Sequence, residues 1–157
     1  MDKIELSKID NEKVECNIFE QINSDAESNV HINIFQGLPK SDKMELIIQK
    51  CVELGVKEIT PVEMKRCVAK IEDKAKNKKI ERWQKISKVA AKQSGRDRVP
   101  KINDVINVKN ICNLTSEYDI VLVAYENEDK NTLKNELIKL KEKTNKNLKI
   151  GIIIGPE

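Results

Sequence analysis

Three side chains suited to binding phosphate groups or base edges lie close together in the middle of the sequence. Gln93, Arg96 and Arg98 follow a basic stretch and precede Pro100. A guanidinium group presents a planar fork of hydrogen-bond donors, which matches phosphate oxygens and base edges. A fixed guanidinium can also stabilise negative charge that develops during a reaction, as an oxyanion site does. The alternative is a solvated loop in which both arginines pair locally with Asp97.

The same part of the chain carries most of its positive charge. Residues 65–101 hold 14 Lys and Arg against four Asp and Glu, whereas the remainder holds 15 against 22. A positive block on a mildly negative body indicates a polyanionic partner. At the helical repeat, four of these cations fall within about a quarter turn of one another, namely Lys78, Arg82, Lys85 and Lys92. The alternative is that this basic stripe is an ordinary solvated face.

A helix over residues 80–93 is expected to position the basic stripe. Its other side is largely apolar and holds Ile80, Trp83 and Ala90. We therefore expect Trp83 in the core rather than stacked on a base. Ser94 and Gly95 are expected to end the helix.

The stretch 32–66 predicts a strand, a helix and a second strand. Gly37 stops the first β-forming run. Asp42 can cap the helix, with Glu45 at the position of a capping-box partner. Gly55 is expected to end the helix in the left-handed conformation. One side of the helix is apolar at helical spacing, through Met44, Ile47, Ile48, Cys51 and Leu54. Two strands joined by a crossover helix form a right-handed βαβ unit with parallel strands.

Two later segments are apolar throughout, as strands covered on both faces are. They span residues 119–126 and 148–154, and an amphipathic helix is expected between them over 131–143. This alternation predicts an α/β fold with a parallel sheet and crossover helices. Such sheets bind ligands beyond the carboxyl ends of their strands, here segments 37–40, 124–126 and 155–157. No Gly-x-Gly-x-x-Gly occurs, which argues against a Rossmann dinucleotide site.

Composition excludes several other classes of function. His31 is the only histidine, so one chain cannot build a histidine-based triad or a multi-histidine metal site, and we expect no metal. The four cysteines are widely spaced and are expected to be reduced thiols. No apolar run approaches membrane-spanning length, and no signal peptide is visible. We therefore expect a cytoplasmic protein without membrane contact.

Four blocks, in order along the chain, resemble one family of enzymes. The first is Gly-Leu-Pro-Lys-Ser-Asp-Lys-Met-Glu-Leu-Ile-Ile-Gln-Lys (37–50) with Glu-Leu-Gly-Val (53–56). The others are Glu-Arg-Trp-Gln-Lys-Ile (81–86), Ala-Ala-Lys-Gln-Ser-Gly-Arg-Asp-Arg-Val-Pro (90–100) and Ile-Ile-Ile-Gly-Pro-Glu (152–157). Together they look like the RsmE family of the SPOUT superfamily, whose members methylate N3 of a uridine in 16S ribosomal RNA. The resemblance implies S-adenosyl-L-methionine as the cofactor.

The resemblance also implies roles for individual residues. Half of the cofactor pocket would come from the ends of two late strands, through Ala124, Tyr125, Glu126, Gly155, Pro156 and Glu157. The catalytic site would hold Gln93, Arg96 and Arg98 at the target uridine, with Arg96 as the favoured stabiliser of charge on the uracil. RNA contacts are implied for the basic stripe and for Lys40 and Lys43.

By the same resemblance, residues 1–28 would be the last part of a PUA-like β-barrel with a linker. Residues 29–157 would be a SPOUT methyltransferase domain. Relatives continue past the last block with the segment that forms their trefoil knot, so the sequence as written is expected to lack the knot. The expected partners are 16S rRNA or the small ribosomal subunit, and a second copy in a homodimer. The alternative is a non-catalytic RNA-binding or ribosome-assembly module, which would keep the basic stripe and lose cofactor affinity.

Overall fold

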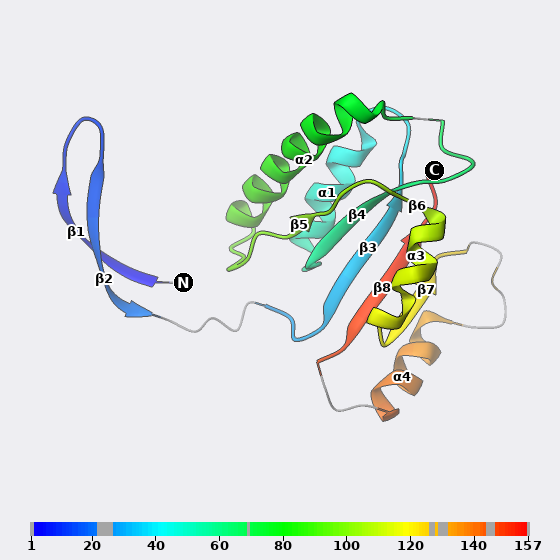
Figure 1. The fold of residues 1–157 in the computed structure, drawn as a ribbon. Coiled ribbons are helices and arrows are strands. Elements are labelled where there is room, and N and C mark those ends of the chain that lie inside the picture. Colours follow the sequence, from blue (N-terminus) through cyan, green and yellow to red (C-terminus); the bar gives the residue numbers. More distant parts are fainter. Residues whose placement is uncertain are drawn as a thin grey trace.

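A parallel sheet organises the computed structural model, which describes residues 2–21, 27–68, 70–125, 128, 132–143 and 147–156. Its strand order is β5-β4-β3-β8-β7, and β6 also pairs with β4. Every pairing among these strands is parallel. The strands are β3 (His31–Gly37), β4 (Glu58–Glu63), β5 (Lys101–Ile102), β6 (Ile106–Asn107), β7 (Ile120–Val123) and β8 (Lys149–Ile154). The predicted α/β fold with a parallel sheet is confirmed (Figure 1).

The predicted βαβ unit forms from β3, α1 (Lys43–Glu53) and β4. Gly55 follows α1 with φ of 98°, which is the expected left-handed conformation. The predicted capping box is wrong, because the Asp42 side chain makes no capping hydrogen bond. Glu45 instead pairs with Arg82 of α2 (Asp73–Gln93), at 2.7 Å.

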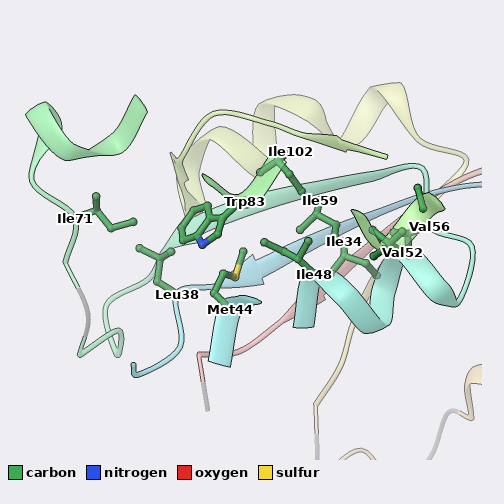
Figure 2. Packing of buried hydrophobic residues seen from close by; sticks show 12 residues of the cluster. Ile34, Leu38, Met44, Ile48, Val52, Val56, Ile59, Ile71, Trp83 and Ile102 are labelled. Atoms are coloured by element: carbon green, nitrogen blue, oxygen red, sulfur yellow. The ribbon is translucent and has the colours of Figure 1, made fainter. Parts of the chain in front are cut away.

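Helices α1 and α2 cover one face of the sheet and form the larger core with it. Figure 2 shows Ile48 and Val52 of α1 directed toward Ile34 and Ile59 of the sheet. Trp83 is 5% exposed within this core, so its predicted place is confirmed. The predicted apolar face of α1 is partly wrong, because Val52 is buried while Leu54, just past the helix end, is 83% exposed.

The other face of the sheet is covered by α3 (Val108–Leu114), which a short 3₁₀ helix, η1 (Thr115–Glu117), extends. Phe35, Val62 and Ile111 form a second, smaller core there. The rings of Phe35 and Tyr118 meet edge to face, with centroids 5.6 Å apart. Successive residues of β3 thus supply opposite cores, as the strand alternation requires.

Of three later elements, two differ from expectation and one agrees with it. Helix α2 begins at Asp73 rather than at residue 80, so the lysine-rich stretch before the predicted start is helical. Strand β7 was expected to be covered on both faces, but among the described strands it pairs with β8 alone, and it is only partly buried. Helix α4 (Leu133–Lys143) forms close to its predicted place.

The amino-terminal segment forms a separate antiparallel hairpin of β1 (Asp2–Ile9) and β2 (Val14–Gln21). It stands away from the α/β body in Figure 1, and its described side chains are all exposed. Two strands are too few to close a barrel by themselves. Across the described ranges, no helix has the length and apolar character needed to cross a membrane.

Candidate functional site

The carboxyl ends of β3, β8 and β7 lie side by side. Gln36 of β3 pairs with Ile154 of β8, and Val123 of β7 pairs with Ile153. The turns that follow these strands therefore meet at one edge of the sheet, where open α/β sheets bind ligands. The predicted cofactor residues Ala124, Tyr125, Gly155 and Pro156 are together at this edge. The other two, Glu126 and Glu157, lie outside the described residues.

A buried amide ties two of these turns together. Gln36 is 2% exposed, and its Nε2 donates to the carbonyl oxygens of Gly37 and Gly155, each at 2.9 Å. A buried acceptor that lost this donor would be left unsatisfied, so the amide fixes the spacing of the two turns. The sequence analysis did not single out Gln36. Its signal was a polar residue at the end of an otherwise β-forming apolar run.

The same two turns pack backbone against backbone at Gly37. A Cβ atom at this position would lie 2.8 Å from the Pro156 nitrogen and 3.0 Å from the Gly155 carbonyl carbon. Only glycine allows this approach. By contrast, a Cβ atom on Gly155 would meet nothing within 4 Å, so the outer side of this turn is open.

The open side of the edge is bordered by apolar groups. Val123 and Tyr125 are 66% and 63% exposed, and Pro156 stands at the neighbouring turn. Exposed backbone beside apolar side chains suits a flat heterocycle, which needs stacking surface and main-chain hydrogen bonds. In the part of the chain that the structure describes, no cluster of three or more potential metal ligands occurs.

The predicted RNA-binding lysines of the first loop also lie at this edge. Lys40 and Lys43 line a hollow of about 500 Å³ together with Arg66, Val68 and Pro156. Arg66 was not among the predicted site residues, although it belongs to the basic block of the sequence. The hollow lies on the β4 side of the edge and shares Pro156 with the predicted cofactor residues, whereas Ala124 and Tyr125 follow β7.

Three of the four cations of the basic stripe line a groove beside α2. Lys78, Arg82 and Lys85 border it together with Gln93, and its volume is about 530 Å³. Arg82 reaches across to Glu45 of α1. The fourth member, Lys92, is exposed but does not line the groove. Gln93 thus lies with the basic stripe and not with the strand ends.

The guanidinium of Arg96 is buried and hydrogen-bonded within the fold, which contradicts its predicted place at a reacting base. Its Nη1 donates to the carbonyl oxygens of Val52 at 3.0 Å and Val56 at 2.6 Å. Its Nε and Nη2 donate to the Glu27 carboxylate at 3.1 Å and 2.6 Å. The side chain is 6% exposed. These bonds occupy both sides of the guanidinium fork, so it is not available to a substrate.

The position of Arg96 in the sheet gives the second reason for this correction. Val56 lies two residues before β4, so Arg96 lies at the amino edge, roughly 17–20 Å from the carboxyl edge at about 3.3 Å per residue. Arg98 lies near it, where its backbone N–H is 3.3 Å from the Glu27 carboxylate. Within one chain, the structure therefore brings none of Gln93, Arg96 and Arg98 to the strand ends.

Glu27 was missed by the sequence analysis, because nothing local marks it. The hydrogen bond from Arg96, supported by its positive charge, holds the pKa of Glu27 below its ordinary value. The sole histidine is likewise at the amino edge, where His31 Nε2 lies 3.0 Å from the Glu58 carboxylate. Neither group faces the candidate site.

The fold and site together define an α/β domain that gathers ligand-binding features beyond its strand ends, with basic surface on the β4 side and beside α2. Residues 26–157 match the family described as RNA methyltransferase domain, and the chain belongs to this family. The resemblance to the RsmE family is confirmed by the relatives that follow.

Two curated relatives are both named ribosomal RNA small subunit methyltransferase E. The Bacillus subtilis protein is 37% identical over 155 residues, which cover 99% of this chain and 60% of the relative. The Mesomycoplasma hyopneumoniae protein is 31% identical over 140 residues, covering 89% and 57%. The chain thus spans about 60% of the length of these relatives.

Solved structures show the same fold. A ribosomal RNA small subunit methyltransferase E from Neisseria gonorrhoeae, bound to S-adenosyl methionine, superposes with a TM-score of 0.78 at 26% identity. The match covers 99% of this chain and 61% of that one. A putative methyltransferase from Legionella pneumophila, also with its cofactor, gives a TM-score of 0.72 at 22% identity, which supports the fold alone.

Proposed function

We propose that this domain acts in S-adenosylmethionine-dependent methylation of N3 of a uridine in 16S ribosomal RNA. The observation that carries the proposal is the joined edge at which β3, β8 and β7 end. There the buried Gln36 amide and the close approach at Gly37 fix two turns, and the outer side of Gly155 stays open. The gonococcal relative with this fold was crystallised with S-adenosyl methionine, which supports the same cofactor here.

Ala124, Tyr125, Gly155 and Pro156 would hold the cofactor, through main-chain groups and apolar contacts. S-adenosylmethionine supplies an electrophilic methyl group when bound. The chain's own contribution is to fix the turns, to exclude water with apolar surface and to present the uridine in line with that methyl group. The imide proton at N3 must also leave, so a proton acceptor or a stabiliser of negative charge is required nearby.

The basic surfaces support RNA as the partner. The groove with Lys78, Arg82 and Lys85 and the hollow with Lys40 and Lys43 both begin near the carboxyl edge, because α1 and α2 start there. Cations at these sites can neutralise backbone phosphates and release bound counterions. The 16S rRNA or the small ribosomal subunit is the partner that the named relatives suggest.

A homodimer is part of the proposal, because a second copy could place its carboxyl edge next to the predicted catalytic residues Gln93 and Arg98. Gln93 and Arg98 are exposed at the amino edge of their own chain. They can serve a reacting base only at the carboxyl edge of a second copy. Arg96 drops out of this role, because its guanidinium is occupied.

The proposed domain division supports the same function. A SPOUT domain over residues 29–157 fits the parallel sheet with its crossover helices. Part of a PUA-like RNA-binding barrel over residues 1–28 fits the two-stranded hairpin. The alternative function, a non-catalytic RNA-binding or assembly module, is favoured only by the basic groove, which needs no cofactor.

Calorimetric titration with S-adenosylmethionine tests the choice between enzyme and module. It is applied to this chain and to a version extended past Glu157, and binding by the extended version is expected. Gly37→Ala in that version should weaken binding at least about tenfold, because the new Cβ forces the turns apart. Gly55→Ala is the matched control, since it strains the backbone by about 1 kcal/mol at the opposite edge. Absence of cofactor binding in both versions would favour the module.

A further inference from the structure

The hollow at the carboxyl edge, here called the basic hollow, is lined by three cations and two apolar residues. Lys40, Lys43 and Arg66 line it with Val68 and Pro156, so none of the described residues that line it is a carboxylate. Its volume of about 500 Å³ is large enough for a phosphate group with part of its sugar. Three like charges around one cavity repel one another, so an anion in the cavity would be favourable.

The cations of the basic hollow lack partners within the described ranges. None of the three side chains forms a hydrogen bond or ion pair with a described residue, and all three are exposed. Neighbouring cations differ from them. Lys76 contacts the carboxylates of Glu63 and Asp73 at 3.3 Å and 2.9 Å. Nearby carboxylates therefore neutralise Lys76, whereas no described carboxylate neutralises the cations of the hollow.

The helix terminus beside the hollow favours anions, and a hydrogen-bonded turn fixes the backbone that carries Arg66. Helix α1 begins at Lys43, and the Asp42 side chain does not cap its first N–H groups. A helix amino terminus favours anions. Arg66 stands in a closed turn, because the Cys67 N–H donates to the Met64 carbonyl at 3.0 Å and the Met64 N–H donates to the Cys67 Sγ at 3.2 Å.

The hollow shares Pro156 with the predicted cofactor residues but lies on the β4 side of the others. Along the edge the strands follow the order β4, β3, β8, β7. At about 4.8 Å between neighbouring strands, the β4 side lies roughly 14 Å from the β7 side, where Ala124 and Tyr125 stand. Pro156 lies between them and borders the hollow. An RNA strand on the β4 side can thus send one base toward the cofactor side while its backbone stays outside.

We infer that the basic hollow binds a backbone phosphate of the RNA next to the target nucleotide, with Arg66 as the bidentate contact. This inference rests on the proposed function for the identity of the RNA. An arginine fork matches two phosphate oxygens, and Lys40 and Lys43 add point charges from the facing loop. The carboxylate of the methyl donor is the other source of an oxyanion at this edge, and the experiment separates the two.

The experiment measures binding of a short uridine-containing RNA oligonucleotide by fluorescence anisotropy over a potassium chloride series. Arg66→Gln should lower the slope of log affinity against log salt by about 0.7, the value for one phosphate contact on a single strand. The Lys40→Gln, Lys43→Gln, Arg66→Gln triple variant should lower it by about 2. Lys88→Gln is the matched control, because Lys88 is an exposed lysine of α2 that lines neither the hollow nor the groove. This variant should leave the salt slope close to that of the parent protein.

Calorimetry with S-adenosylmethionine on the same variants, in the version extended past Glu157, completes the test. Unchanged cofactor affinity beside a lowered salt slope supports the inference. A salt slope equal to that of Lys88→Gln overturns it, and so does a loss of cofactor affinity with RNA binding intact. If the parent protein binds no cofactor but the salt slope still falls in Arg66→Gln, the enzyme proposal fails while the phosphate site stands.

Discussion

Replacing Arg96 with alanine tests whether its guanidinium holds the fold or serves the reaction. The change removes the donors from the carbonyl groups of Val52 and Val56 and from the Glu27 carboxylate. The side chains of Arg96 and Glu27 are 6% and 13% exposed. Breaking a buried pair from one side costs about 3–5 kcal/mol. We expect about 3 kcal/mol of lost unfolding free energy, since water can still reach Glu27.

Urea unfolding followed by circular dichroism measures this loss against related variants. Arg96→Lys keeps the charge but not the fork, and should lose about 1–2 kcal/mol. Glu27→Gln should lose a similar amount of about 1–2 kcal/mol. The double variant with Arg96→Ala should lose at least about 1 kcal/mol less than the sum, because the two residues share one interaction. Arg98→Ala is the control and should stay within about 0.5 kcal/mol.

The pH dependence gives a second measurement on the same pair. The pKa of Glu27 is held below its ordinary value of 4.5, mainly by the hydrogen bond from Arg96. A carboxyl with a lower pKa in the folded state binds fewer protons there, so its stabilisation is present above the unfolded pKa and is lost as pH falls through the folded pKa. The stability difference between the parent protein and Glu27→Gln should be full near neutral pH and shrink below about 4.5.

One combination of results would refute this account of Arg96. Arg96→Ala would have to unfold within about 0.5 kcal/mol of the parent protein. In a version extended past Glu157, it would also have to lose single-turnover methylation at saturating RNA and cofactor. The guanidinium would then act on the reaction and not on the fold.

Three further predictions concern other parts of the molecule. Arg82→Glu with Lys85→Glu should weaken RNA binding and flatten its salt dependence by about 1.4 slope units, measured by anisotropy; an unchanged slope would remove the groove from the RNA interface. Cys51→Ala should lower the urea-derived stability by about 1 kcal/mol, because the thiol is partly buried against the main core and burial raises its pKa; loss of methylation with folding and cofactor binding intact would contradict this. Gln36→Leu should cost about 2 kcal/mol in the same assay, because it removes donors from the Gly37 and Gly155 carbonyl groups, and a smaller loss than that of Arg98→Ala would show that the amide does not hold the turns.

The fold was predictable where the signal is local. The β3–α1–β4 unit follows from strand and helix periodicity between two glycines, and the left-handed Gly55 from the need to end a helix before a strand. For the site, the sequence predicted which edge of the sheet holds it, but not all of the residues that lie there. Strand ends meet there because parallel strands share a direction, so the turns at Ala124 and Gly155 lie together as expected.

What could not be predicted depends on contacts between distant residues. Arg96 and Glu27 are 69 residues apart in the chain, and no pattern near either one signals the pairing. The direction of α2 explains why the predicted catalytic arginines lie away from the strand ends. The carboxyl end of α2, with Arg96 and Arg98 after it, lies at the amino edge of the sheet. Glu45, expected to complete the capping box, pairs with Arg82 of another helix instead, and Asp42 has φ of −86° and ψ of 9° rather than the extended backbone of a typical capping residue.

The bond between Glu27 and Arg96 sets where the α/β body can be cut from the hairpin in a recombinant fragment. A fragment that starts at Ser28, one residue later, would retain the guanidinium in its buried place and lose the carboxylate that balances it. Such a fragment should express poorly and melt early, although every strand and helix of the sheet remains. One that starts before Glu27 keeps the pair, and crystallisation or binding work on the isolated body should begin there.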